Sequence, residues 1–146
     1  MSTPARSTRS ISAELIIATM LNTPAIVALV GTRRALAQLP PNTSMPALVY
    51  TVIDSKPTPN LNYQVGEQRA LARIQINPLA TTIGEVKAIH EAVRAALDFK
   101  HQTIVVDQKV ISCRLDLMGP VDKDTDAGVW TQPYDYLLNF VEFSTD

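Results

Sequence analysis

The residues of this chain that could do chemistry are two histidines, a single cysteine and a short acidic run. His90 and His101 lie eleven residues apart, and Cys113 is the only cysteine. A zinc site needs several His or Cys ligands at close spacing, which this set does not provide. Neither histidine accompanies a nucleophile motif such as G-x-S-x-G. We therefore expect no catalytic residues, and we interpret His90 as a surface residue of a helix.

The acidic run consists of Asp122, Asp124 and Asp126 and invites comparison with a calcium-binding loop. Counted from Asp122, position six is Ala127 rather than glycine, and position twelve is Pro133 rather than glutamate. The EF-hand pattern therefore fails. The chain also has no P-loop and no G-x-G-x-x-G segment. The sequence predicts no metal site and no cofactor, and the acidic run is interpreted as part of a solvated loop.

Charge is unevenly spread along the chain, although the total is close to neutral at −1. A near-neutral total argues against a protein whose main role is to grip nucleic acid. Before residue 39 one acid, Glu14, stands against four arginines: Arg6, Arg9, Arg33 and Arg34. From Leu115 onward seven acids stand against one base, Lys123. Either the basic start of one copy meets the acidic end of another, or the two ends are solvated and unrelated.

The elements that must position these residues follow from hydrophobic periodicity. Residues 82–98 carry an apolar stripe at helical spacing, and Thr82 with Glu85 forms a capping-box pattern. Residues 11–31 read as a helix interrupted at Asn22-Thr23-Pro24 and closed by Gly31. Strand patterns occupy residues 34–39, 47–54, 69–77, 103–106, 109–118 and 132–143. Residues 55–68 read as a long polar loop, and Pro78 is expected to end a strand.

These elements predict an α+β fold, with a mostly antiparallel sheet of four to six strands and two helices packed on one face. We expect residues 1–10 to form a flexible N-terminal arm and residues 11–146 a single domain. A chain of 146 residues can fold without a metal or a disulfide. The lone cysteine fits a reducing compartment. No apolar run approaches the ~18 residues that span a bilayer, so no membrane partner is expected.

The last predicted strand is apolar on both faces. Tyr134 and Tyr136 lie on one face, and Leu137 and Val141 lie on the other. A strand with two apolar faces must be covered on both sides. Helices can cover one side, and a second subunit or a loop must cover the other, which indicates an oligomer. Trp130, just before this strand, is interpreted either as a core residue or as an interface anchor.

The order of these features resembles that of the phage tail completion, or tail terminator, family of long-tailed bacteriophages. A helix runs into LVGTRR (29–34), a proline-bearing loop leads to MPALVY (45–50), and a variable loop and the strand ALARIQI follow. The helix EVKAIHEAVRAALD and a final aromatic strand complete the pattern. The resemblance covers roughly Ser12 to Phe143 and carries no catalytic signature.

The resemblance implies a structural virion protein whose subunits form a ring, commonly a hexamer. Such a ring caps the tail tube and joins it to the head-neck, so the implied location is the head-proximal end of the virion tail, after assembly in the host cytoplasm. The implied partners are further copies of the chain, the tail tube protein, a head-neck connector protein, and genomic DNA that passes through the lumen without sequence-specific binding. The family supplies no catalytic residues to carry over.

Physical argument then assigns interface roles within that picture. Arg6, Arg9, Arg33 and Arg34 are candidates for contact with the acidic segment of a neighbour. The loop at residues 56–68 is a candidate for docking onto the tube or a neck protein through Leu61 and Tyr63. Aromatic candidates for subunit contact are Trp130, Tyr134 and Tyr136. The polar strand faces at Arg73, Gln75, Arg114 and Asp116 are candidates for lining a lumen.

Two alternatives remain at this stage. The first, in the same class, is a head-tail connector or a tail tube subunit. The second, in another class, is a small α+β enzyme or ligand-binding module that uses His90 or the acidic run. That second alternative predicts a pocket that gathers polar groups.

Overall fold

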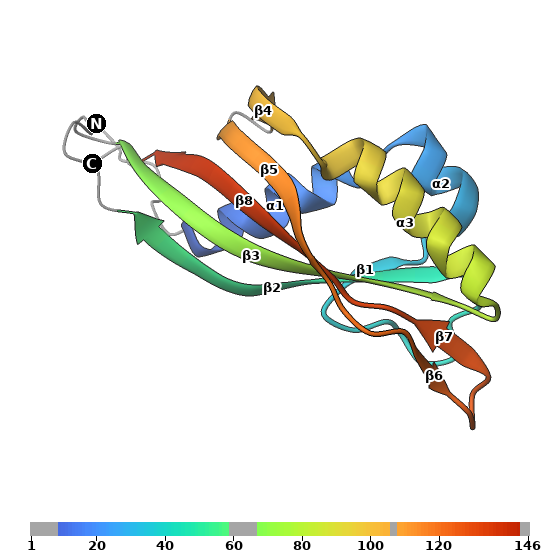
Figure 1. The fold of residues 1–146 in the computed structure, drawn as a ribbon. Helices are drawn as coiled ribbons and strands as arrows, with labels where there is room; N and C mark the ends of the chain where they lie inside the picture. The colour runs from blue at the N-terminus through green and yellow to red at the C-terminus, as the bar shows by residue number, and fades with distance from the viewer. Residues whose placement is uncertain (1–8, 59–66, 106–107, 144–146) are drawn as a thin grey trace.

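The computed structural model of the protein describes residues 9–58, 67–105 and 108–143 (Figure 1). Within these ranges the helices are α1 Arg9–Met20, α2 Pro24–Val30 and α3 Ile83–Leu97. The strands are β1 Arg34–Leu36, β2 Ala47–Thr58, β3 Glu67–Ala80, β4 Lys100–Val105, β5 Gln108–Met118, β6 Asp122–Asp124, β7 Val129–Thr131 and β8 Tyr134–Phe143.

All eight strands belong to one sheet. Six of them follow the order β1-β2-β3-β8-β5-β4, while β6 and β7 form a short hairpin that joins the sheet where β7 pairs with β3. The strand β1 runs parallel to β2, and the other pairs in the described ranges are antiparallel. The structure confirms the predicted α+β fold with a mostly antiparallel sheet. The hairpin takes the strand number beyond the predicted range of four to six.

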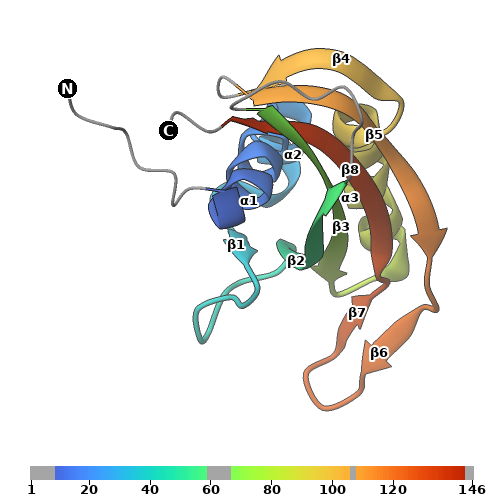
Figure 2. The same ribbon diagram turned by 90° about the vertical axis from the view of Figure 1, so that its left-hand side faces the viewer.

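The helices pack against one face of this sheet, and the core lies between the two layers. The helix α1 contacts β2, β8 and β4, while α3 contacts β3, β5 and β7. Figure 2 shows β5 and β4 bending over the helices. Alternate residues of β8 point into the core and are almost fully buried, namely Tyr134, Tyr136, Leu138 and Phe140. We call the opposite side of β2, β3, β8 and β5 the open sheet face, because no described helix covers it.

The break between α1 and α2 follows the predicted residues. Thr23 caps α2, its side-chain oxygen accepting from the backbone N–H of Ile26 at 3.4 Å, and Pro24 occupies the first turn. Gly31 ends α2 with a φ of 59°, which glycine adopts without the cost of a Cβ. The helix α1 begins at Arg9, inside the segment expected to be an arm. That residues 1–8 form a flexible arm stays a prediction, since they lie outside the described residues.

The helix α3 carries the predicted cap and the predicted apolar stripe. The Thr82 hydroxyl accepts from the backbone N–H of Glu85 at 3.2 Å, and the Glu85 carboxylate accepts from that hydroxyl at 3.3 Å. At its other end the Asp98 carboxylate accepts from the backbone N–H of Leu115 in β5 at 2.8 Å. The same carboxylate accepts from Arg94 Nε at 2.8 Å. The first pair of bonds caps the start of α3, and the bond from Leu115 fixes its end to the sheet.

The prediction that residues 55–68 form a loop is wrong at both ends of this range, where the structure has strands. The strand β2 continues to Thr58 and β3 begins at Glu67, with Lys56 paired to Leu71 and Pro57 paired to Ala70. Beyond Tyr50 the outer edge of β2 has no partner strand in the described part of the chain, because β1 pairs only as far as that residue. A proline on a free edge removes no ladder hydrogen bond, which explains why Pro57 does not end the strand.

Two strand boundaries differ from the prediction near β3 and β1. Pro78 does not end β3, which pairs with Leu48 at that position and continues to Ala80. The pairing of β3 with β8 stops at Ile76, so Pro78 lies beyond the β8 ladder. The strand β1 ends at Leu36 rather than at residue 39. Ala37 has a φ of 67°, a left-handed conformation that turns the chain out of the strand.

Strict alternation in residues 109–118 predicts that Cys113 and Leu117 face inward and that Val110 faces outward, and this prediction is only partly right. Cys113 is buried as expected, but Val110, expected outward, is fully buried, and Leu117, expected inward, is 55% exposed. The register of β5 against β8 shifts between Val110 and Ser112 and again between Leu115 and Leu117. Each bulge adds a residue to one strand and reverses the side on which later residues lie. A strict alternation cannot anticipate such a change.

The predicted acidic loop also contains regular structure. Asp122, Lys123 and Asp124 form β6, which pairs with Thr131, Trp130 and Val129 of β7. The turn between these strands is closed by the Asp124 carboxylate, which accepts from the backbone N–H groups of Asp126 and Ala127. Gly128 follows with a φ of 69°. The acidic residues are therefore displayed on an ordered β-hairpin.

Candidate interaction surfaces

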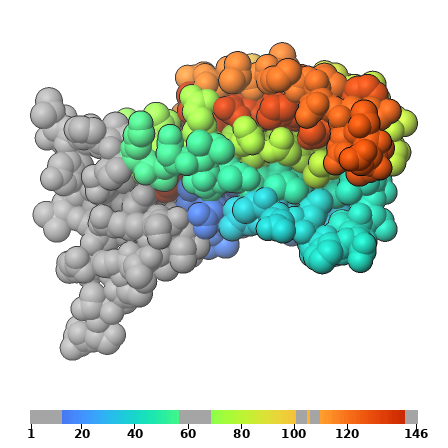
Figure 3. All heavy atoms as spheres, turned by 90° about the horizontal axis from the view of Figure 1, so that it is seen from below, coloured from blue at the N-terminus to red at the C-terminus, as the bar shows by residue number. Residues whose placement is uncertain are grey.

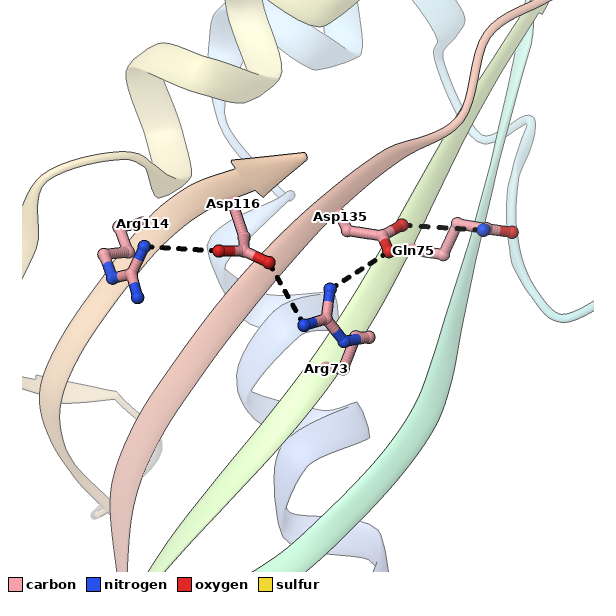
Figure 4. A network of polar contacts seen from close by, with 5 residues as sticks. All are labelled: Arg73, Gln75, Arg114, Asp116 and Asp135. Carbon is pink, nitrogen blue, oxygen red and sulfur yellow. Dashed lines mark hydrogen bonds and ion pairs between the residues drawn. The ribbon is translucent and has the colours of Figure 1, made fainter. Parts of the chain in front are cut away.

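The open sheet face carries a network of charged side chains from three adjacent strands (Figure 4). Arg73 of β3 forms ion pairs with Asp116 of β5 at 3.1 Å and with Asp135 of β8 at 3.2 Å. Arg114 lies 3.4 Å from the second oxygen of Asp116. Gln75 donates to the other oxygen of Asp135 at 3.5 Å. The network therefore ties β3, β8 and β5 together across the surface.

Strand geometry explains why these residues meet. Arg73 and Gln75 lie two apart on β3 and share a face, and Gln75 pairs directly with Asp135. Arg73 and Arg114 both pair with Leu137, one from each side of β8. The network contains two guanidinium groups and two carboxylates, so its charges balance. Hydrogen bonds to Asp116 and then to Asp135 raise the pKa of Arg73, which stays protonated.

A second surface lies at the start of β1, where two arginines contact neutral acceptors. Arg33 Nε donates to the carbonyl of Pro46 at 2.7 Å. Arg34 Nη1 donates to the carbonyl of Leu21 at 3.2 Å and to Asn22 Oδ1 at 3.5 Å. Neither arginine forms an ion pair with a carboxylate in the described ranges. Their charges therefore have no ion-pair partner among the described residues.

The third surface is the β6–β7 hairpin, which extends away from the main sheet (Figures 1 and 2). Asp122, Asp124 and Asp126 are all exposed on it. The Lys123 ammonium lies 5.2 Å from the centre of the Trp130 ring, at cation–π distance. Trp130 is half-buried and packs against the core. The arrangement gives a negatively charged projection with an ordered base.

The structure corrects the interpretation of Tyr134 and Tyr136 as interface residues. Both side chains are directed at α3 and have 1% and 0% exposure. The expectation that His90 lies on the surface is also wrong, because its side chain is buried at 4% exposure. The His90 ring stacks on Tyr134 at 3.4 Å, and its Nε2 shares a hydrogen bond of 2.9 Å with the Tyr136 hydroxyl. These three residues stabilise the contact between α3 and β8 inside the subunit.

Burial controls the ionisation of this cluster. It lowers the pKa of His90 to about 4, and the positive charges of Arg94 and Lys87 add to the effect. Burial also raises the pKa of the Tyr136 hydroxyl. The same cause raises the pKa of the Cys113 thiol to about 12. At neutral pH the histidine, the tyrosine and the cysteine are therefore uncharged core residues.

The remaining predicted residues are only partly placed. The arginines at the start of β1 form no ion pair with the acidic hairpin in the described ranges, although β1 and β7 belong to the same sheet, with β2 and β3 between them. Arg6, Leu61 and Tyr63 lie outside the described residues, and so does the side chain of Arg9. The described side chains contain no group of three His, Cys, Asp or Glu residues that could hold a metal ion.

Two features of the structure were not predicted from the sequence. Asp135 lies between the buried Tyr134 and Tyr136 on β8. Because side chains alternate along a strand, the sequence could have placed Asp135 on the opposite, open sheet face. Phe99, directly after α3, is 76% exposed with a φ of 59°. Nothing in the local pattern indicates that an aromatic residue takes this position, where glycine is usual.

The described helices are short compared with a membrane span. None is long and apolar enough to cross a bilayer alone. One pair of helices, Ala13–Met20 with Pro24–Val30, is bent by 84° and reaches the length and apolar composition of a membrane span only when the two are counted together.

Comparison with known proteins places this arrangement in a family. Residues 14–128 match the family model described as "Tail completion protein gp17". No curated protein sequence matches the chain. Among solved structures, the fold is similar to a chain of the "Virion of native gene transfer agent (GTA) particle", with a TM-score of 0.63 and 14% identity. The similarity covers 88% of this chain and 96% of that chain. Since the family model matches most of the sequence, the chain belongs to the tail completion protein gp17 family.

Proposed function

We propose that this protein is the structural subunit that completes a virion tail, forming a ring on the head-proximal end of the tail tube. Membership of the tail completion family supports this role. The similar fold of a chain from a gene transfer agent virion is consistent with it. The proposed ring is a hexamer that assembles in the host cytoplasm. Its proposed partners are further copies of the chain, the tail tube protein and a head-neck connector protein.

The observation that carries the proposal is the charge balance of the open sheet face. A ring on the path of genomic DNA must let phosphates pass, and unpaired Lys or Arg side chains would hold them. On this face Arg73 is neutralised by Asp116 and Asp135, and Arg114 contacts Asp116. The network itself has no excess of positive charge, and the exposed Leu71 and Arg69 lie on the same face of β3. We therefore propose that the open sheet face borders the lumen.

Docking onto the tube or the neck is assigned to the far end of the β2–β3 hairpin. Both strands extend beyond the length expected from the sequence, β2 to Thr58 and β3 from Glu67. Leu61 and Tyr63 belong to the connecting residues 59–66 and remain proposed docking residues. The hairpin strands pair from Thr58 and Arg69 inward, with a register shift between Val52 and Asp54.

Electron microscopy of the purified protein tests the proposed function. We expect closed single rings, or rings that cap one end of tail tubes isolated from the same virus. Long filaments of the pure protein would instead identify a tail tube subunit. A particle that neither forms rings nor binds tube ends would overturn the proposal. An enzyme acting through His90 would need an accessible imidazole, and this one is enclosed by Tyr134 and Tyr136.

A further inference from the structure

We propose that a pocket beside Arg34 receives the carboxylate of Asp126 from a second copy of the chain. The pair would join the basic corner of one subunit to the β6–β7 hairpin of the next. This inference rests on the proposed function, since it specifies the contact that closes the ring. It concerns a surface and a partner residue that the family assignment does not supply.

The receiving site, which we call the Arg34 pocket, is a cavity of about 190 Å³. It is lined by Ala18, Leu21, Asn22, Arg34 and Tyr50. These residues come from the end of α1 and the turn after it, the start of β1 and the paired segment of β2. The pocket therefore lies where the helical layer meets the β1 edge of the sheet. At about 30 Å³ per water molecule in the liquid, the space admits a short carboxylate side chain together with water.

The polar atoms around the pocket are arranged to receive an anion. The Arg34 guanidinium is oriented by two neutral acceptors, the carbonyl of Leu21 and Oδ1 of Asn22. Its Nε is buried and has no hydrogen-bond partner. Burial raises the pKa of Tyr50, so its hydroxyl stays protonated and can donate. Arg34 has no ion pair with a described carboxylate, and a half-buried cation is stabilised by a carboxylate that comes from outside.

Asp126 is the carboxylate best placed to fill this role. One oxygen of Asp122 already accepts from the backbone N–H of Lys123, and one oxygen of Asp124 closes the hairpin turn. The Asp126 side chain forms no hydrogen bond or ion pair with the described residues. It is exposed in the turn between β6 and β7, at the end of the hairpin that extends furthest from the sheet.

The positions of the two partners fit a ring. Figures 1 and 2 show the β6–β7 hairpin extending away from the sheet, so its tip is directed outward, where it can reach the pocket of a second copy. A contact between two different surfaces of identical copies is heterologous, and it generates a closed ring when the rotation between copies closes. Opposite charges on the two surfaces also steer the copies into register.

Charge reversal tests the pair in the full-length protein. Asp126→Arg should lower the association constant of each subunit contact at least about tenfold, the expected result of placing like charges together. Arg34→Glu should do the same, and the double variant should recover most of the association. Glu91→Arg, which reverses an exposed charge on α3, serves as the matched control and should assemble normally. Sedimentation velocity measures assembly, or tube capping does so if rings form only on tubes.

Arg34 also donates to the carbonyl of Leu21, so Arg34→Glu can prevent assembly simply by disturbing the fold. A second measurement separates that effect from loss of the proposed contact. Protein carrying Asn22→Cys is mixed with protein carrying Asp126→Cys and oxidised. We expect a disulfide between the two different proteins, and none when either is oxidised alone. Normal rings from a folded Asp126→Arg variant, or the absence of the mixed disulfide, would overturn the pair and leave the proposed function intact. A wild-type protein that neither forms rings nor caps tubes would overturn the proposed function itself.

Discussion

At the scale of single residues, the most constrained side chains are those between α3 and the carboxyl-terminal strands. His90 stacks on Tyr134, and the Tyr134 hydroxyl donates to Gln132 Oε1 at 2.6 Å. Lys87 Nζ donates to the same Gln132 oxygen at 2.6 Å, while Gln132 Nε2 donates to the carbonyl of Gly119 at 2.8 Å. A buried polar network of this kind stabilises the fold only while each member has its partner.

The burial of His90 predicts a loss of stability in mild acid. Its pKa is about 4 in the folded protein, against about 6.5 in an unfolded chain. Between these values the unfolded state binds more protons, so the free energy of unfolding falls as the pH decreases from about 6.5 to about 4. We expect a decrease of the order of 2–3 kcal/mol over that range. Urea denaturation at a series of pH values measures it.

The control for this prediction is His90→Gln, which keeps a hydrogen-bonding side chain but cannot titrate. Its starting stability should be lower, because a flexible amide does not stack on Tyr134 as an imidazole does. Its stability should then change less between pH 6.5 and pH 4 than that of the wild type. An equal pH dependence in both proteins would show that other groups are responsible.

At the scale of elements, the end of α3 is the point where a helix is fixed to the sheet. Asp98 accepts hydrogen bonds from Leu115 and Phe99 backbone N–H groups and from Arg94. Burial alone would raise the pKa of Asp98, but these three donors outweigh it and lower that pKa. The carboxylate therefore stays charged and joins α3 to β5 at a position where the chain must turn sharply into Phe99 and β4.

Substitution at Asp98 should show how much this junction contributes. We expect Asp98→Ala to lower the free energy of unfolding by about 2–4 kcal/mol, because it leaves a backbone N–H and a guanidinium without their acceptor. Asp98→Asn keeps one acceptor oxygen and should cost clearly less. Thermal and urea denaturation at pH 7 compare the two variants. If both substitutions lower the free energy of unfolding by the same small amount, packing and not the Asp98 carboxylate holds the junction together.

At the scale of the whole molecule, the two sides of the sheet have different tasks. The helix side holds the apolar core, from Ile16 and Ile17 of α1 to Val93 of α3 and Phe140 of β8. The open sheet face instead holds the balanced network around Arg73. In the proposed ring the first side gives each subunit its stability, and the second side gives the assembly a surface that does not retain DNA.

Removing the acids of that network should make the protein bind DNA. Asp116→Asn combined with Asp135→Asn leaves Arg73 and Arg114 without counter-charges. We expect clearly tighter binding of double-stranded DNA than by the wild type at low salt. The logarithm of the affinity should fall with the logarithm of the salt concentration, by about 0.9 for each phosphate contacted. Fluorescence anisotropy with labelled DNA measures both quantities.

The matched control carries Glu14→Gln with Glu91→Gln, which changes the net charge by the same amount on helices α1 and α3. It should bind DNA no better than the wild type. If both double variants bind equally well, total charge rather than the open sheet face governs the interaction. The lumen assignment would then be withdrawn, while ring formation would remain open to its own test.

The sequence predicted the parts of this protein that depend on near neighbours along the chain. The helix from Thr82, its Glu85 partner, the cap at Thr23 and the closure at Gly31 all rest on spacings of a few residues. The alternation in β8 correctly identified the face that carries Tyr134 and Tyr136. It did not identify what covers that face, so both residues were placed at an interface instead of against α3.

Tertiary structure decided what depends on pairing between distant segments. The bulges in β5 reversed the expected facing of Val110 and Leu117, because strand register is set by the partner strand. The ion pairs of Arg73 join residues 43 and 62 positions apart, so no local pattern predicts them. The burial of His90 likewise follows from the position of α3 over β8. Local spacing fixes a helix or a strand, whereas the surface that meets a partner is fixed only when the sheet is assembled.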